Sequence, residues 1–192
     1  MPTIDTELFY AANKSQWRKW LEKNYNKKDG VWLVQYKRNS GVSTISWSDA
    51  VDEALCFGWI DSIKHPIDEE KFKQFFSKRK ASSTWSKVNK EKVEQLIASG
   101  KMHPAGLACI EIAQKNGMWS ILDTVDALEI PVDLEKAFRK IKGSKAFFES
   151  QSKTSKKGML QWLVLAKRPE TRQQRINEIA MLAGEGKKPK QF

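Results

Sequence analysis

The sequence predicts an α+β fold, with a small antiparallel or mixed sheet packed with helices and an all-helical segment after it. In the first half, short runs that alternate apolar and polar residues, such as Val31–Lys37, are separated by segments with helical spacing. Beyond Pro131, apolar residues recur at helical spacing alone. Eight Trp and nine Phe among 192 residues supply enough apolar surface for a core.

The chain is expected to begin with a short edge strand at Leu8–Tyr10 and a helix that reaches Asn24. Asn13, followed three residues later by Gln16, has the spacing of a capping box, which satisfies the first N–H groups of a helix. The strand Val31–Lys37 comes next, after a turn that ends in glycine.

A second helix is expected to run directly into a strand. Ser48 is its expected N-cap, and Gly58 ends it because glycine readily adopts the left-handed conformation. Trp59–Ile63 then alternates as a half-buried strand does. Asp61 lies on the face opposite Ile60, where a carboxylate can meet solvent or a ligand.

That strand is expected to pair with Phe72–Phe76 in a hairpin, which leads into the polar loop Ser77–Lys87. The loop holds three consecutive cations, several hydroxyl groups and one Trp. A loop that binds phosphate needs such groups, and long loops without regular structure are often functional.

Two helices follow the loop. Ser86 or Asn89 caps the first, and Gly100 ends it. Pro104 opens the second, since proline is favoured at the first helical position, and Gly117 closes it.

The expected organisation is an α+β core over residues 1–124, a helical segment over residues 125–186 and a frayed basic tail over residues 187–192. Asp123–Pro131 reads as the boundary between the first two parts. The helices expected beyond it are Asp133–Ile141, Ser144–Glu149, Thr154–Lys167 and Pro169–Ala183.

Charge is the strongest compositional signal, at +11 with an isoelectric point near 9.6. Such a surface attracts nucleic acid, acidic lipids or acidic proteins, although a lysine-rich surface alone is common among soluble proteins. Cys56 and Cys109 lie in apolar helical surroundings and are expected to be buried free thiols. No leader or membrane-spanning run is evident, so the cytoplasm is the expected location.

The sequence lacks the motifs of several common metal sites and catalytic sites. His65 and His103 are far apart and lack partners at zinc-like spacing. Cys56 lies within an apolar helical face, whereas a catalytic thiol needs an electropositive and partly exposed site. Phosphate-binding glycine patterns and hydrolase elbows are missing as well. We therefore assign no catalytic residue, metal site or cofactor.

The best candidate site combines the turn at Gly58, between the second helix and the strand, with the polar and basic loop Ser77–Lys87. Asp61 is expected to form a salt bridge with Arg79, and Trp85 would offer a face for stacking. The candidate ligand-binding residues are Trp59, Asp61, Lys78, Arg79, Lys80, Ser82, Trp85, Ser86 and Asn89.

An alternative interpretation gives these residues structural roles. Trp85 would fill the core, and Ser86 and Asn89 would only cap a helix. Asp52 and Glu53, which could join Asp61 in a group of carboxylates, are more simply the solvated face of their helix.

Four runs carry a family resemblance: Glu53–Asp61, Trp85–Asn89, Gly100–Gly106 and Ala166–Arg172. In order, they are similar to the YdeI/OmpD-associated proteins of bacteria, also called bacteriocin-protection proteins. The resemblance extends over nearly the whole chain. It implies an α+β core like that of YjbR/CyaY-type proteins, followed by the helical OmpD-associated segment.

Three functional hypotheses follow. The first is a non-enzymatic cytoplasmic protein that binds an anionic ligand or partner and, by resemblance, acts in resistance to bacteriocins, antimicrobial peptides or stress. The second is a nucleic-acid-binding protein that uses the basic loop. The third is an enzyme with a pocket centred on Asp61, which would require a perturbed carboxylate.

Overall fold

The computed structural model describes residues 7–192, which form two compact units that divide between Trp119 and Ser120. The first unit contains β1 (Leu8–Tyr10), α1 (Lys14–Asn24), β2 (Gly30–Tyr36), the 3₁₀ turn η1 (Arg38–Ser40), α2 (Trp47–Cys56), β3 (Trp59–Pro66), β4 (Lys71–Lys78), α3 (Lys87–Ala98) and α4 (Pro104–Lys115). The second contains α5 (Asp123–Asp126), α6 (Val132–Lys140), α7 (Ser144–Ser150), α8 (Lys153–Val164) and α9 (Pro169–Gly184). The residue-124 boundary expected from the sequence falls within α5.

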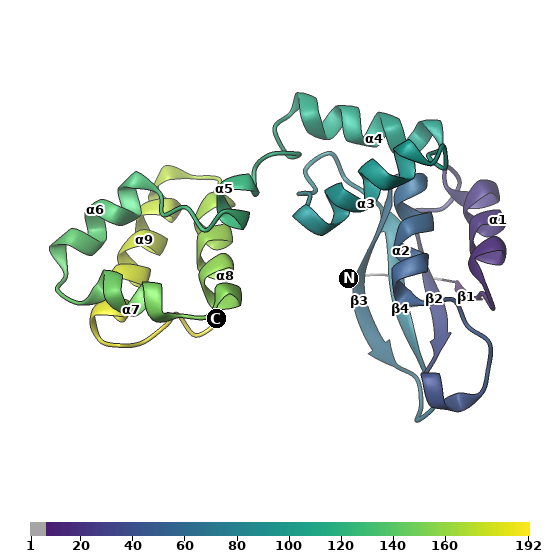
Figure 1. The fold of residues 1–192 in the computed structure, drawn as a ribbon, viewed down its shortest axis with the longest axis horizontal. Coiled ribbons are helices and arrows are strands. Elements are labelled where there is room, and N and C mark those ends of the chain that lie inside the picture. The colour runs from purple at the N-terminus through teal and green to yellow at the C-terminus, as the bar shows by residue number, and fades with distance from the viewer. Residues whose placement is uncertain (1–6) are drawn as a thin grey trace. The chain divides into compact units, whose positions relative to one another are not determined.

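The sheet is mixed, with strand order β1-β2-β4-β3, and the predicted α+β class is confirmed. β1 pairs with β2 in parallel, and the other pairs are antiparallel. Val31 and Leu33 point into a core that also contains Phe76 of β4, and α1 and α2 pack on this face (Figure 1). Side chains alternate across a strand, so the neighbouring residues lie on the opposite face.

Helix α2 begins earlier than expected. Its N-cap is Ser46, whose Oγ accepts a hydrogen bond from the Asp49 N–H at 3.1 Å. Ser48, the predicted cap, lies inside the helix and its Oγ accepts a hydrogen bond from Lys92. The helix ends at Cys56, and Gly58 two residues later takes the predicted left-handed conformation, with a φ of +73°.

The hairpin is longer than predicted. β3 continues to Pro66, and residues 67–70 connect it to β4. The register shifts between Asp61 and Lys64, so a bulge at residues 62–63 interrupts the alternation of side chains along β3.

Helix α4 packs against the end of α2 through a glycine. The His103 N–H donates to the Cys56 carbonyl at 3.0 Å, and a Cβ on Gly106 would lie 2.3 Å from the same oxygen. Only a residue without a side chain permits this approach.

The second unit has its own core, which includes Leu134, Phe138 and Phe148. Helix α8 ends at Val164 rather than Lys167, and Arg168, which precedes Pro169, is extended and caps α9. None of the helices in the described part of the chain is long and apolar enough to cross a bilayer.

The residues after Gly186 do not form the frayed tail that was expected. Phe192 packs on Trp162, with ring centroids 5.9 Å apart, and lies against Gly158. Lys188 donates a hydrogen bond to Ser155 of α8. Aromatic burial of this kind holds a terminus against its helix.

Replacing Gly106 by Ala is expected to destabilise the first unit by about 2 kcal/mol, because the new methyl group overlaps the Cys56 carbonyl. Urea unfolding followed by far-UV circular dichroism measures the effect. The matched control is Gln114→Ala at an exposed position of the same helix, which should change stability by less than about 0.5 kcal/mol. Equal stability of the two variants would contradict the close contact.

Candidate functional site

A hollow of about 410 Å³ lies beside the elbow between α2 and β3. We call it the elbow groove, and its lining includes Tyr25, Phe57, Gly58, Lys78, Arg79 and Cys109. A Cβ on Gly58 would lie 3.2 Å from both the Cys109 Cβ and the Ala105 carbonyl oxygen. Glycine thus allows α4 to form one wall of the groove close to the elbow backbone.

Arg79 is the most unusual charge in the groove. Its backbone N–H donates to the Gly58 carbonyl at 2.9 Å, which fixes it beside the elbow. The guanidinium lies 3.7 Å from the centroid of the Trp85 ring and donates one hydrogen bond, from Nη1 to the Thr84 carbonyl at 3.0 Å. Its Nε is buried without a hydrogen-bond partner.

Among the ion pairs of residues 7–192, none joins Arg79 to a carboxylate. Burial lowers the pKa of its guanidinium to about 10, although the more distant charge of Asp61 favours protonation. A buried charge normally has a partner of opposite sign, since removing it from water is costly. An anion in the groove would supply that partner.

Lys78 provides a second cation. Its Nζ forms a 3.1 Å ion pair with Asp29 and donates to the Asn26 carbonyl at 3.2 Å. The Asp29 side chain is 99% exposed, so this pair is weak. A ligand anion can therefore compete for the ammonium group at little cost.

The two thiols differ in position. Cys56 is fully buried as predicted, and burial raises its pKa to about 11. Cys109 is partly exposed in the groove, so the prediction that it is buried is wrong. Burial also raises the pKa of Cys109, while the neighbouring Arg79 charge lowers it.

His103 serves as the N-cap of α4. Its Nδ1 accepts a hydrogen bond from the Ala105 N–H at 3.2 Å, and its ring stacks on Phe57 at 4.8 Å between centroids. Within the part of the chain that the structure describes, no group of His, Cys, Asp and Glu is placed to hold a metal ion.

Two of the predicted site residues are core residues instead. Trp59 is fully buried and donates from Nε1 to the Tyr25 carbonyl at 3.2 Å. Trp85 is 1% exposed, covered by Arg79 and packed on Trp119. Neither ring is open to a ligand, which corrects the expected stacking role of Trp85.

The remaining loop residues do not gather in the groove. Lys80 and Ser82 are exposed and lie outside its lining. Ser86 caps α3, and its Oγ accepts a hydrogen bond from the Asn89 N–H at 3.3 Å. Ser86 therefore has the capping role of the structural alternative, whereas Asn89 lies in the first turn of α3 and contributes only its backbone N–H.

The predicted salt bridge between Asp61 and Arg79 is wrong. Asp61 accepts hydrogen bonds from Trp47 Nε1 at 2.8 Å and Gln74 Nε2 at 3.4 Å. Trp47, which is 52% exposed, lies outside the helix if Ser48 is the cap, so the sequence does not point to this contact. With Ser46 as the cap, Trp47 becomes the first helical residue and lies beside β3.

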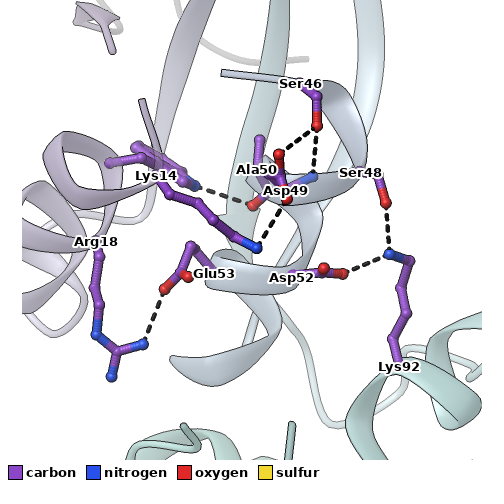
Figure 2. Close-up of polar contacts among 10 residues, drawn as sticks. Lys14, Arg18, Ser46, Ser48, Asp49, Ala50, Asp52, Glu53 and Lys92 are labelled. Atoms are coloured by element: carbon purple, nitrogen blue, oxygen red, sulfur yellow. Dashed lines mark hydrogen bonds and ion pairs between the residues drawn. The ribbon is translucent and has the colours of Figure 1, made fainter. Parts of the chain in front are cut away.

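The polar side of α2 is a network of ion pairs rather than the solvated face that was expected (Figure 2). Each of three carboxylates pairs with a cation from a neighbouring helix: Asp49 with Lys14 at 2.8 Å, Glu53 with Arg18 at 2.9 Å, and Asp52 with Lys92 at 2.5 Å. The hydrogen bond from Lys14 holds the pKa of Asp49 below its usual range.

Arg18 links this network to the groove wall. It donates to the Lys101 carbonyl at 3.1 Å, and its guanidinium lies 5.3 Å from the centroid of the Phe57 ring. Glu53, only 5% exposed, is its buried partner. The pair therefore fixes the last turn of α2, from which the elbow starts.

Replacing Glu53 by Gln is expected to destabilise the protein by about 2 kcal/mol, because it leaves Arg18 without its buried counter-charge. Urea unfolding provides the measurement. The control is Glu22→Gln, which removes the exposed partner of the same arginine and should cost less than about 0.5 kcal/mol. The assignment fails if the control variant is destabilised as much as Glu53→Gln.

Alkylation should distinguish the two thiols. Cys109 is expected to react with iodoacetamide at about pH 8 and faster as pH rises, because only the thiolate attacks. Cys56 should react only on unfolding. Mass spectrometry of the digested protein locates the label, and Cys109→Ser should leave the native protein unlabelled. Rapid labelling of native Cys56 would contradict its burial.

Two family models match the chain. Residues 9–109, more than half of it, match a family described as Domain of unknown function (DUF8412). Residues 127–186 match a family described as Bacteriocin-protection, YdeI or OmpD-Associated. Neither the search of curated proteins nor that of solved structures found a match.

These matches confirm the resemblance only in part. Ala166–Arg172 lies within the YdeI or OmpD-Associated match, whereas the three earlier runs lie within the other. The expected relation of the first unit to YjbR/CyaY-type proteins is not supported.

Proposed function

The chain belongs to the family described as Domain of unknown function (DUF8412), and we propose that it is a non-enzymatic binding protein that holds a small anionic ligand in the elbow groove. The observation that carries the proposal is the Arg79 guanidinium, which is largely buried at the groove without a carboxylate partner. Lys78, with its weak and exposed partner, adds a second positive charge.

The groups around the groove favour binding over catalysis. The Cys109 thiol has a raised pKa, which keeps it protonated at neutral pH. His103 has one ring nitrogen engaged in capping α4 and its ring between Tyr25 and Phe57. The groups that line the groove are therefore two cations, Lys78 and Arg79, and apolar side chains such as Phe57. Such an arrangement orients a ligand.

The helical segment suggests the role of this binding. Residues 127–186 match a family described as Bacteriocin-protection, YdeI or OmpD-Associated, and we extend that description to this chain as a proposal. In this proposal the protein acts in the cytoplasm, where binding of the anion contributes to resistance to bacteriocins or other antimicrobial peptides.

A nucleic-acid interface on the basic loop has less support. Its three consecutive cations do not form one surface, because Lys78 lines the groove, Arg79 is largely buried and Lys80 is exposed outside the groove. Recognition of a phosphate backbone needs several cations on a common face.

Inorganic phosphate and pyrophosphate are suitable probes of the groove. Both are expected to bind the wild-type chain in calorimetry and to slow alkylation of Cys109, since an anion beside Arg79 covers the thiol and offsets the charge that lowers its pKa. Lys78→Ala should weaken binding about tenfold through the loss of one charge-assisted hydrogen bond.

Two further variants make the test decisive. Lys80→Ala removes a neighbouring exposed lysine and should bind like the wild type. Arg79→Lys keeps the charge but loses the planar donor, so weaker binding with unchanged thermal stability supports the role of the guanidinium. The proposal is overturned if neither anion binds, or if Lys80→Ala weakens binding as much as Lys78→Ala.

A further inference from the structure

The face of the sheet opposite α1 and α2 presents an aromatic ring on every strand. The pairings Trp32 with Phe75 and His65 with Lys73 place these residues on that face. Tyr10 of β1 and Tyr36 of β2 complete the set. Helices α1 and α2 of the first unit pack on the other face, with Val31, Leu33 and Phe76.

The rings form two groups, each with a lysine above it. Trp32 contacts Phe75 and His65 at centroid distances of 5.0 and 5.3 Å, and the Lys73 ammonium lies 4.7 Å from the Trp32 centroid. Tyr10 meets Tyr36 at 5.6 Å, with the Lys71 ammonium 5.8 Å from the Tyr36 centroid. The exposed Tyr10 and His65 lie at opposite sides of the set.

Charge on this face has one sign. The strand residues that point to it include Lys71 and Lys73 and no Asp or Glu. Asp68, Glu69 and Glu70 follow the end of β3 in the hairpin turn, where Asp68 pairs with Lys71 at 3.4 Å. Glu7, just before β1, accepts the Trp32 N–H with its carbonyl and pairs its carboxylate with Lys28. Lys73 forms no ion pair among the described residues.

We infer that this face binds single-stranded nucleic acid, with bases stacked on the rings of Tyr36 and its neighbours and phosphates held by Lys71 and Lys73. The rings most open to a base are Tyr10, which is 40% exposed, and His65, which is also exposed. Tyr36 is half-buried, and Trp32 is 8% exposed beneath Lys73. A ring that a base can reach accepts any base, and adjacent lysines complement the backbone charge. An acidic protein would use the lysines but has no need of a ring on each strand. A duplex would present its phosphates while its bases remain stacked inside.

Fluorescence anisotropy of a labelled oligothymidine of about twelve nucleotides tests the inference on the full chain, at about 50 and 200 mM salt. We expect binding to the single strand that weakens with salt, and clearly weaker binding to a duplex of the same length. Tyr36→Ala should weaken binding at least about fivefold through lost stacking. Lys73→Glu should weaken it about tenfold or more and lower the salt slope.

Matched controls separate the face from the rest of the basic surface. Lys80→Glu makes the same charge change on the loop, and Lys78→Ala empties the elbow groove of one cation, so both should bind the oligonucleotide within about twofold of the wild type. Glu69→Lys, in the hairpin turn beside the face, should strengthen binding. Thermal unfolding confirms that each variant is folded.

Four results would overturn the inference: no binding at the lower salt, equal affinity for the duplex, equal losses in Lys73→Glu and Lys80→Glu, or displacement of the oligonucleotide by polyglutamate at equal charge. The last result would assign the face to acidic proteins instead. Phosphate binding in the elbow groove is tested with Lys78→Ala, and oligonucleotide binding on the sheet face with Tyr36→Ala and Lys73→Glu. One proposal can therefore be disproved while the other stands.

Discussion

The left-handed turn at Gly58 is the constraint on which the first unit depends. The backbone just before it offers the Cys56 carbonyl to the His103 N–H, and Gly58 itself offers its carbonyl to the Arg79 N–H. These two bonds connect the end of α2 to the start of α4 and to the end of β4. A side chain at this position would be strained and would press on Cys109. The elbow groove exists because three elements converge on one turn without side-chain bulk.

Helix α2 is held by charge on one side and by apolar contact on the other. Its buried residues include Val51, Ala54 and Leu55, whereas its carboxylates pair with α1 and α3. Each exposed ion pair contributes little to stability alone. Glu53, however, is nearly inaccessible to solvent, and its partner Arg18 also contacts Phe57 of the groove wall. The position of the elbow, and hence of Arg79, follows from this arrangement of helices.

Local signals in the sequence predict most of the fold, and non-local pairing explains the errors. Asn13, Gly58, Pro104 and Gly117 mark helix ends through backbone chemistry that depends on neighbours in the chain, and the structure agrees at each. Glu53, the buried partner of Arg18, and Trp47, the partner of Asp61, are 35 and 14 residues away, so no spacing rule identifies them. Of the candidate site residues, Lys78 and Arg79 line the elbow groove. The sequence could not distinguish a buried Trp85 from an exposed one, because both follow a polar loop equally well.

The separate cores of the two units have an optical consequence. Seven of the eight tryptophans precede Ser120, and the second unit contains only Trp162. Intrinsic emission therefore reports almost entirely on the first unit, while the second reports through one indole that lies beneath Arg175 and beside Phe192. A Trp162→Phe protein would make the second unit invisible at tryptophan wavelengths. The difference between its emission and that of the parent would then isolate the second unit within the intact chain.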